Sequence, residues 1–236
     1  MSEHHNFEKL DIKDPTRPIK VVGTVDADVP EASRRFLNHK VDQVVFPNGN
    51  QGWHHRIIVP EGVMLAHLDP DEKLALVTNY RHPIGRHSVE LPSGGAEPEE
   101  GAALLELEGQ EKEDLLTQIA LREFEEELGW KVDPNHTRRM FKGPLQGSVG
   151  FADQTYHIFR AEGGEQSVQK HDDGEEGLLT HDRYEVSDAA EMVGREIVDP
   201  ATATAVKDLA AELGHRSDNL NRISSHRTTI PVHRNR

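Results

Sequence analysis

Three glutamates, Glu123, Glu126 and Glu127, are spaced three and four residues apart in the chain. On an ideal helix, which turns by about 100° per residue, their side chains fall within about 100° of one another. Phe124 and Leu128 gather on a different side of that helix. Like charges at this spacing destabilise a helix unless a cation binds to them. Because Mg²⁺ prefers carboxylate and carbonyl oxygens, this face predicts a divalent-cation site; the alternative is an acidic face covered by water.

The charge of the whole chain agrees with a need for such a cation. Its 236 residues include 42 acidic and 27 basic side chains, a formal net charge of −15. An acidic protein repels nucleic acid and anionic membranes, so a polyanionic substrate needs a local metal ion or arginine cluster. The chain has no cysteine, which excludes disulfides, thiolate nucleophiles and cysteine-ligated zinc. The length suits one ordinary domain with at most a small accessory one.

Localisation and partners are expected from what the sequence lacks. No apolar run approaches the roughly 18 residues of a membrane span, and the N-terminus has no apolar signal region. We therefore expect a cytoplasmic protein with neither a membrane nor nucleic acid as partner. Residues 214–236 carry five arginines but no aromatic side chain for base stacking. We expect a basic flexible tail there and not a nucleic-acid arm.

Several short elements must position the glutamates. Apolar runs separated by turn residues predict strands in the front half of the chain, and the turn-rich segment 47–52 predicts a hairpin with a long loop. A short helix is expected near residues 31–38. The expected strands cover residues 19–25, 44–46, 56–59, 63–68 and 73–80.

The back half of the chain alternates between helices and strands. A helix is expected over residues 114–128, with Gly129 as its C-terminal cap. The acidic stretch before it reads as an extended loop with one helical turn near residues 102–107. The order of strands, helix, strands and helix indicates a mixed α/β sandwich. Further strands are expected over residues 138–142, 155–161 and 178–186, and helices over residues 187–193 and 200–213.

Two segments resemble a known family. The second half of the Nudix box is similar to Arg122-Glu123-Phe124-Glu125-Glu126-Glu127-Leu128-Gly129-Trp130. The segment that opens the box in the ADP-ribose pyrophosphatase branch is similar to Glu90-Leu91-Pro92-Ser93-Gly94-Gly95. The resemblance implies a Nudix-type α/β/α sandwich with a mixed sheet over residues 63–213. It also implies a small N-terminal β-rich subdomain over residues 1–62 that joins two chains into a homodimer; the alternative is that this region packs against its own domain.

The resemblance implies roles for the box residues. Glu123 and Glu127 would be the principal metal ligands, Glu126 would support them, and the backbone carbonyl of Ser93 would be a further ligand. The cofactor would be Mg²⁺, with Mn²⁺ as an alternative. Structural roles would go to Arg122, Gly95 and Gly129.

A second set of residues would bind the substrate. Arg81, together with Glu90, matches the substrate-arginine segment of that branch, and a guanidinium can bind two phosphate oxygens at once. The alternative is an exposed arginine at a strand end. Looser similarity at residues 148–153 and 194–199 favours a nucleotide sugar such as ADP-ribose, or a dinucleotide, as substrate. Hydrolysis of its diphosphate would release a nucleoside monophosphate.

The base that deprotonates the attacking water is sought outside the box helix. In the resembling branch a glutamate from a loop beyond the box closes onto the metals. The run His171-Asp172-Asp173-Gly174-Glu175-Glu176-Gly177 offers Glu176, or Glu175, for that role. A solvated acidic loop is the alternative, and Glu126 or Glu123 would then be the next candidates for the base.

Departures from the family pattern keep other readings open. Asp114 stands where the family has a glutamate, and Gly95 lies about thirteen residues too far upstream, which indicates an insertion over residues 96–113. A catalytically weak Nudix-fold sensor of ADP-ribose-type ligands is therefore one alternative, and an acidic interaction protein is another. His54-His55 and His82 have no second matching cluster, so we expect them to be solvated or structural.

Overall fold

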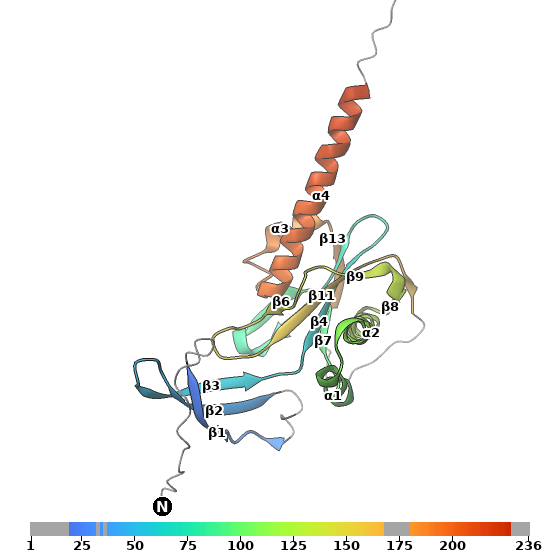
Figure 1. Cartoon of the computed structure of the whole chain (residues 1–236). Helices are drawn as coiled ribbons and strands as arrows, with labels where there is room; N and C mark the ends of the chain where they lie inside the picture. Colours follow the sequence, from blue (N-terminus) through green and yellow to red (C-terminus); the bar gives the residue numbers. More distant parts are fainter. Residues whose placement is uncertain (1–18, 32–33, 35–36, 168–179, 228–236) are drawn as a thin grey trace, which may run out of the picture. The chain divides into compact units, whose positions relative to one another are not determined.

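The computed structural model describes residues 19–31, 34, 37–167 and 180–227. The chain forms two compact units, coloured along the sequence in Figure 1. The first unit comprises Met1–Val63, Gly94–Ile119 and Gly143–His157. The second comprises Met64–Ser93, Ala120–Lys142 and Ile158–Arg236. Each unit is considered by itself below.

A three-stranded antiparallel sheet dominates the first unit. Its strands are β1 (Lys20–Asp26), β2 (Asn38–Val45) and β3 (Gln51–Ile58), in the order β1-β2-β3. The predicted hairpin is confirmed, and its loop uses a left-handed glycine, Gly49, at φ 84°. The helix expected near residues 31–38 is wrong at its end, where Asn38 already belongs to β2.

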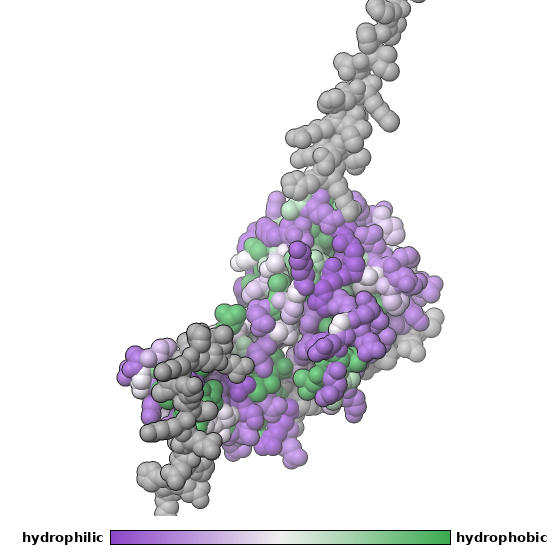
Figure 2. Space-filling view, in the orientation of Figure 1, coloured by the Kyte–Doolittle hydropathy of each residue, from purple (hydrophilic) through white to green (hydrophobic). Residues whose placement is uncertain are grey.

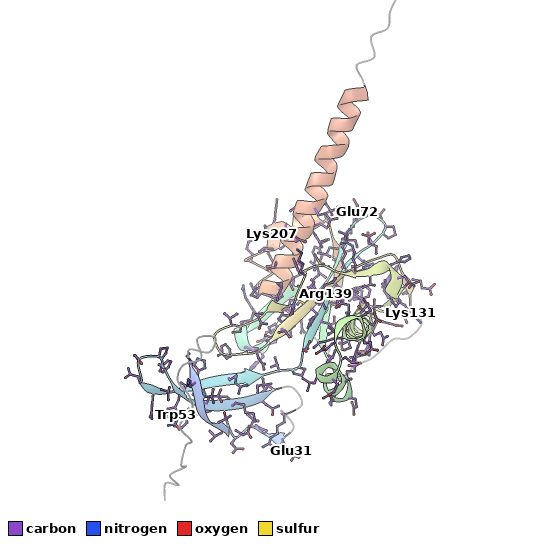
Figure 3. All side chains as sticks on the ribbon, viewed as in Figure 1. Glu31, Trp53, Glu72, Lys131, Arg139 and Lys207 are labelled. Carbon is purple, nitrogen blue, oxygen red and sulfur yellow. The ribbon has the colours of Figure 1, made fainter. Side chains whose placement is uncertain are left out.

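The N-terminal sheet buries some of its large apolar side chains and exposes others. Val44 retains 2% of its exposure within the chain itself, whereas Trp53, labelled in Figure 3, retains 63%. Ile57 pairs with Ala152 and donates its N–H to the Phe151 carbonyl, so β3 is covered by its own unit at that point. Trp53 is therefore open to solvent, whereas Val44 belongs to the core.

A larger sheet has the order β10-β11-β4-β5-β13, with β6 beside β5, β7 beside β4 and β9 beside β11. The predicted mixed sheet is confirmed. All seven residues of β4 are buried, which requires cover on both faces of the sheet. The strands are β4 (Gly62–Leu68), β5 (Leu74–Arg81), β6 (Arg86–Glu90), β7 (Ser93–Gly95), β9 (Thr137–Arg139), β10 (Leu145–Gln146), β11 (Thr155–Glu162) and β13 (Thr180–Tyr184). A separate pair joins β8 (Trp130–Lys131) to β12 (Glu165–Gln166).

Helices α2 (Gly109–Leu128), α3 (Val186–Met192) and α4 (Pro200–Arg227) provide that cover in the second unit (Figure 1). Phe124 of α2 lies on one face, with its ring centroid 4.9 Å from that of His67 in β4. Thr202 of α4 accepts the N–H of Leu91, which follows β6, at 3.2 Å. The expected α/β/α arrangement is confirmed. No helix in the described ranges is long and apolar enough to cross a membrane.

The acidic insertion is helical, which corrects the expected loop. Helix α1 (Pro98–Glu106) begins with a capping box in which Glu97 and Glu100 satisfy each other's backbone N–H groups. Helix α2 begins at Gly109, five residues before the expected start at 114. Two short 3₁₀ turns, His82–Ile84 and Pro134–His136, complete the elements.

Helix α4 also differs from its expected length. It continues to Arg227, 14 residues beyond the expected end at residue 213. Gly214 suggested a stop, but a glycine inside a helix costs only about 1 kcal/mol relative to alanine. A single glycine at position 214 is therefore not enough to end α4. The remainder of the expected basic tail, residues 228–236, lies outside the described residues.

Candidate active site

The box helix presents its glutamates and its apolar residues on separate sides. Phe124 and Leu128 are buried in the core, at 0% and 6% exposure. The side chains of Glu123 and Glu126 keep 16% and 28% of their exposure. In Figure 2 the visible face around α2 is largely hydrophilic. The periodicity that predicts an amphipathic helix thus places the carboxylates at the protein surface.

The two halves of the Nudix box meet at Glu127. The backbone N–H of Ser93, in the opening segment, donates to Oε2 of Glu127 at 3.0 Å. These residues are 34 positions apart in the sequence and belong to the same compact unit. The contact brings the Ser93 backbone beside a carboxylate that was predicted to be a metal ligand.

Arg122 lies among the same carboxylates. Its Nη1 is 2.9 Å from Oε1 of Glu123 and 3.5 Å from Oε2 of Glu126. One guanidinium thus lies beside two of the three box carboxylates. Arg122 orients two of these side chains, in agreement with the structural role that the resemblance implies.

The donor set fits a hard divalent cation in its chemistry. Carboxylate oxygens on one helix face and a nearby backbone carbonyl are the ligands that Mg²⁺ prefers. In the part of the chain that the structure describes, no three His, Asp or Glu side chains are already gathered around one point. The carboxylates instead contact Arg122 and the Ser93 N–H, so binding an ion requires their side chains to rotate.

The predicted substrate residues Arg81 and Glu90 are brought together. Nε of Arg81 donates to Oε1 of Glu90 at 3.0 Å, and Nη2 of Arg81 donates to Oε2. The Glu90 side chain is 4% exposed and the Arg81 side chain 45%. The buried carboxylate therefore fixes the direction of a half-exposed guanidinium.

Asp114 lies on the same helix as the box glutamates but on a different side of it. Asp114 is exposed and its carboxylate accepts a hydrogen bond from Gln110 at 2.7 Å. Because α2 is continuous, nine residues turn Asp114 about 180° from Glu123 and place it about 13 Å away along the axis. On this geometry Asp114 is not placed to bind an ion that Glu123 holds directly.

Gly129 and Gly95 both have predicted structural roles, but only Gly129 has a backbone conformation that favours glycine. Gly129 ends α2 at φ 68° and donates its N–H to the Glu125 carbonyl, a left-handed cap that favours glycine. A Cβ on Gly95 would lie 3.7 Å from Cβ of Pro60, an ordinary contact. Packing alone therefore does not require glycine at position 95.

A buried histidine beneath the box helix was not singled out from the sequence. His67 is 0% exposed and its Nε2 lies 2.5 Å from the Gly163 carbonyl. Nη1 of Arg183 lies 2.8 Å from Nδ1, and the Arg183 guanidinium stacks 5.3 Å from the Trp130 ring. Since arginine only donates, Nδ1 must accept and Nε2 must carry the proton. A lone histidine in an apolar run gives no sequence signal for such a network.

The pKa of His67 lies below its usual value of 6.5, mainly because burial disfavours the charged ring, and the Arg183 charge adds to this. In the unfolded chain the ring takes a proton near pH 6.5, whereas the folded ring resists it. The stabilisation from His67 is therefore complete above pH 6.5 and decreases as the pH falls below it.

We expect His67→Gln to remove this part of the pH dependence. Glutamine can still donate to Gly163 and accept from Arg183, but it does not titrate. Urea unfolding of both proteins between pH 8 and pH 5 should give a smaller loss of unfolding free energy in the variant. The difference in slope can reach about 1.4 kcal/mol per pH unit. Parallel curves would contradict the assignment of a neutral His67.

The candidates for the general base are Glu176, Glu175 and Glu126. Glu175 and Glu176 fall within residues 168–179, outside the described residues, and their role stays a prediction. Glu126, the further candidate for the base, lies on α2 and contacts Arg122.

The chain is similar in sequence to several known proteins. No family model matches the chain. It is 29% identical over 179 residues to an ADP-ribose pyrophosphatase of Bacillus subtilis, covering 75% of this chain and 86% of that protein. It is 29% identical over 131 residues to a methanol dehydrogenase activator of Bacillus methanolicus, covering 56% and 61%. A hydrolase of CMP-5'-(N-acetyl-N-hydroxy-3-aminopropyl)phosphonate from Streptomyces rubellomurinus is 26% identical over 131 residues, covering 56% and 55%.

A solved structure shares the fold. A crystal structure of an ADP compounds hydrolase matches with a TM-score of 0.64 and 16% identity, over 85% of this chain and 96% of that one. The box-like residues, the shared fold and the similarity to an ADP-ribose pyrophosphatase together support the resemblance to the ADP-ribose pyrophosphatase branch of the Nudix hydrolases.

Proposed function

We propose that the chain is a metal-dependent hydrolase that cleaves the diphosphate of ADP-ribose or a related nucleotide sugar and releases a nucleoside monophosphate. The observation that carries the proposal is the hydrogen bond from the Ser93 N–H to Glu127, which joins the two halves of the box. The name of the Bacillus subtilis relative, an ADP-ribose pyrophosphatase, supports the choice of substrate.

The box residues would act together on the diphosphate. Glu123 and Glu127 would hold Mg²⁺, or Mn²⁺ in its place, with Glu126 and the Ser93 carbonyl as supporting donors. When bound, the ion neutralises charge on phosphate oxygens and lowers the pKa of a coordinated water. Arg122, 2.9 Å from Glu123, would keep that carboxylate oriented with and without the bound ion.

Arg81 would bind the diphosphate while Glu90 holds its guanidinium in place. We expect Arg81→Lys to raise KM for ADP-ribose by roughly 10-fold, because lysine keeps the charge but cannot form two parallel hydrogen bonds. Steady-state kinetics give the measurement. Lysine is preferred to alanine because an unpaired, buried Glu90 would destabilise the fold.

Arg86→Lys is the matched control for that variant. Arg86 lies opposite Arg81 in the β5–β6 register and donates to the Arg195 carbonyl instead of a carboxylate. Its KM should stay close to that of the parent protein. Equal KM values in all three proteins would remove Arg81 from the substrate site.

The N-terminal sheet is proposed to join two chains into a homodimer. Within residues 19–58, large apolar side chains stay exposed, and an apolar surface of this kind is typical of an interface. They are Ile19 at 40%, Val21 at 46%, Val25 at 52% and Trp53 at 63% exposure. Light scattering of the full chain at micromolar concentration should give the mass of two chains. The mass of one chain would end this proposal.

The choice of nucleoside is tested with a substrate panel. ADP-ribose, other ADP-sugars and CMP-linked compounds are incubated with the full chain and Mg²⁺, and the products are separated by chromatography. We expect AMP from ADP-ribose as the fastest reaction. Faster release of CMP would shift the proposal toward the chemistry named for the Streptomyces relative. Tight binding without turnover of any compound would favour a ligand sensor.

A further inference from the structure

Two histidines from neighbouring strands face each other on the N-terminal sheet. Nε2 of His39 in β2 lies 2.9 Å from Nδ1 of His55 in β3, and the ring centroids are 5.1 Å apart. The sequence showed only the His54-His55 pair, without a second cluster of ligands. The fold brings a second histidine, His39, beside His55 from 16 residues upstream.

The strand register fixes which histidines share a face. His55 pairs with Val41, and His39 lies two residues before Val41, so His39 and His55 project from the same side. His54 pairs with Asp42 and projects from the opposite side. Strands β2 and β3 are paired along all eight of their residues, which holds the two imidazoles at a fixed spacing.

The pair suits a transition-metal ion. Imidazole nitrogens bind Zn²⁺, Ni²⁺ and Cu²⁺, whereas Mg²⁺ prefers oxygen ligands. Two nitrogens each about 2.0–2.1 Å from a tetrahedral zinc lie about 3.3 Å apart. The observed 2.9 Å separation therefore needs to widen by only about 0.4 Å, with the rings turned toward a common point.

We propose that His39 and His55 bind one Zn²⁺ per chain, with water completing the coordination. The site would be separate from the box, because it uses nitrogen donors and lies in the other compact unit. Within the described ranges no third His, Asp or Glu is gathered with them, so water would have to supply the remaining ligands. The ion would link β2 to β3.

The test is calorimetric titration of the untagged, metal-stripped full chain with Zn²⁺ in excess Mg²⁺. We expect one equivalent of Zn²⁺ to bind and to raise the melting temperature. His39→Ala and His55→Ala should each weaken this binding by at least about 10-fold, the lower end of what losing even an outer partner of a metal site costs. Both variants should also lose the thermal shift.

Two controls separate this site from the other histidines. The first control is His54→Ala, on the opposite face of the same strand, and the second is the double variant His4→Ala/His5→Ala. Both should still bind one equivalent of Zn²⁺ per chain and show the same rise in melting temperature. Undiminished zinc binding in His39→Ala and His55→Ala would overturn the proposal. A stoichiometry of one ion per two chains would equally overturn the water-completed site.

Discussion

Replacing Glu127 by glutamine is expected to lower kcat/KM for ADP-ribose by at least about 100-fold. Losing even an outer-shell partner of a metal costs about 10- to 100-fold in affinity or activity, and Glu127 is proposed as a direct ligand. Glutamine has the same shape, and its carbonyl can still accept the Ser93 N–H, so the fold around the contact should persist. Steady-state kinetics over a range of Mg²⁺ concentrations give kcat/KM and the apparent metal affinity.

Glu125→Gln is the matched control on the same helix. Glu125 accepts a hydrogen bond from Oγ of Ser167 at 2.5 Å and is given no role in metal binding. It should keep kcat/KM within a few-fold of the parent. If Glu127→Gln and Glu125→Gln behave alike, the metal ligands do not include Glu127.

Glu176→Gln is expected to lower kcat by about 10²- to 10⁴-fold while the apparent affinity for Mg²⁺ changes little. A general base contributes a factor of this size, and glutamine cannot take the proton of the attacking water. The split between kcat and metal affinity distinguishes a base from a ligand, since Glu127→Gln should weaken both. Glu175→Gln is measured beside it, because either glutamate fits the proposed role.

Asp173→Asn provides the control within the same run of the sequence. It removes one negative charge close to the two glutamates and should leave kcat near its parent value. Near-normal kcat in both glutamate variants would move the base to Glu126 or Glu123 on α2.

The sequence predicts the elements that have strong periodicity. The apolar runs that predict β4, β5 and β11 match strands with buried stretches: all seven residues of β4, the first four of β5 and five consecutive residues of β11. Helix α1 was missed because its start signal is a pair of glutamates, Glu97 and Glu100, in a stretch that also reads as a solvated acidic loop. Local composition alone does not separate those two outcomes.

Contacts between distant segments are harder to predict. The spacing of Glu123, Glu126 and Glu127 fixes their shared helix face, but only the fold brings the Ser93 N–H to Glu127 across 34 residues. The pair Arg81–Glu90 depends on the β5–β6 register in the same way. His67 and Arg183 are 116 residues apart, and neither carries a motif.

The central claim is that the carboxylate face of α2 holds a divalent cation that drives diphosphate hydrolysis. It is tested most directly by following AMP release from ADP-ribose by the full chain after chelation and again after Mg²⁺ is added back. We predict no release with chelator, full recovery with Mg²⁺, and at most about 1% of that rate in Glu127→Gln. Release of AMP at the same rate with and without the cation would contradict the account.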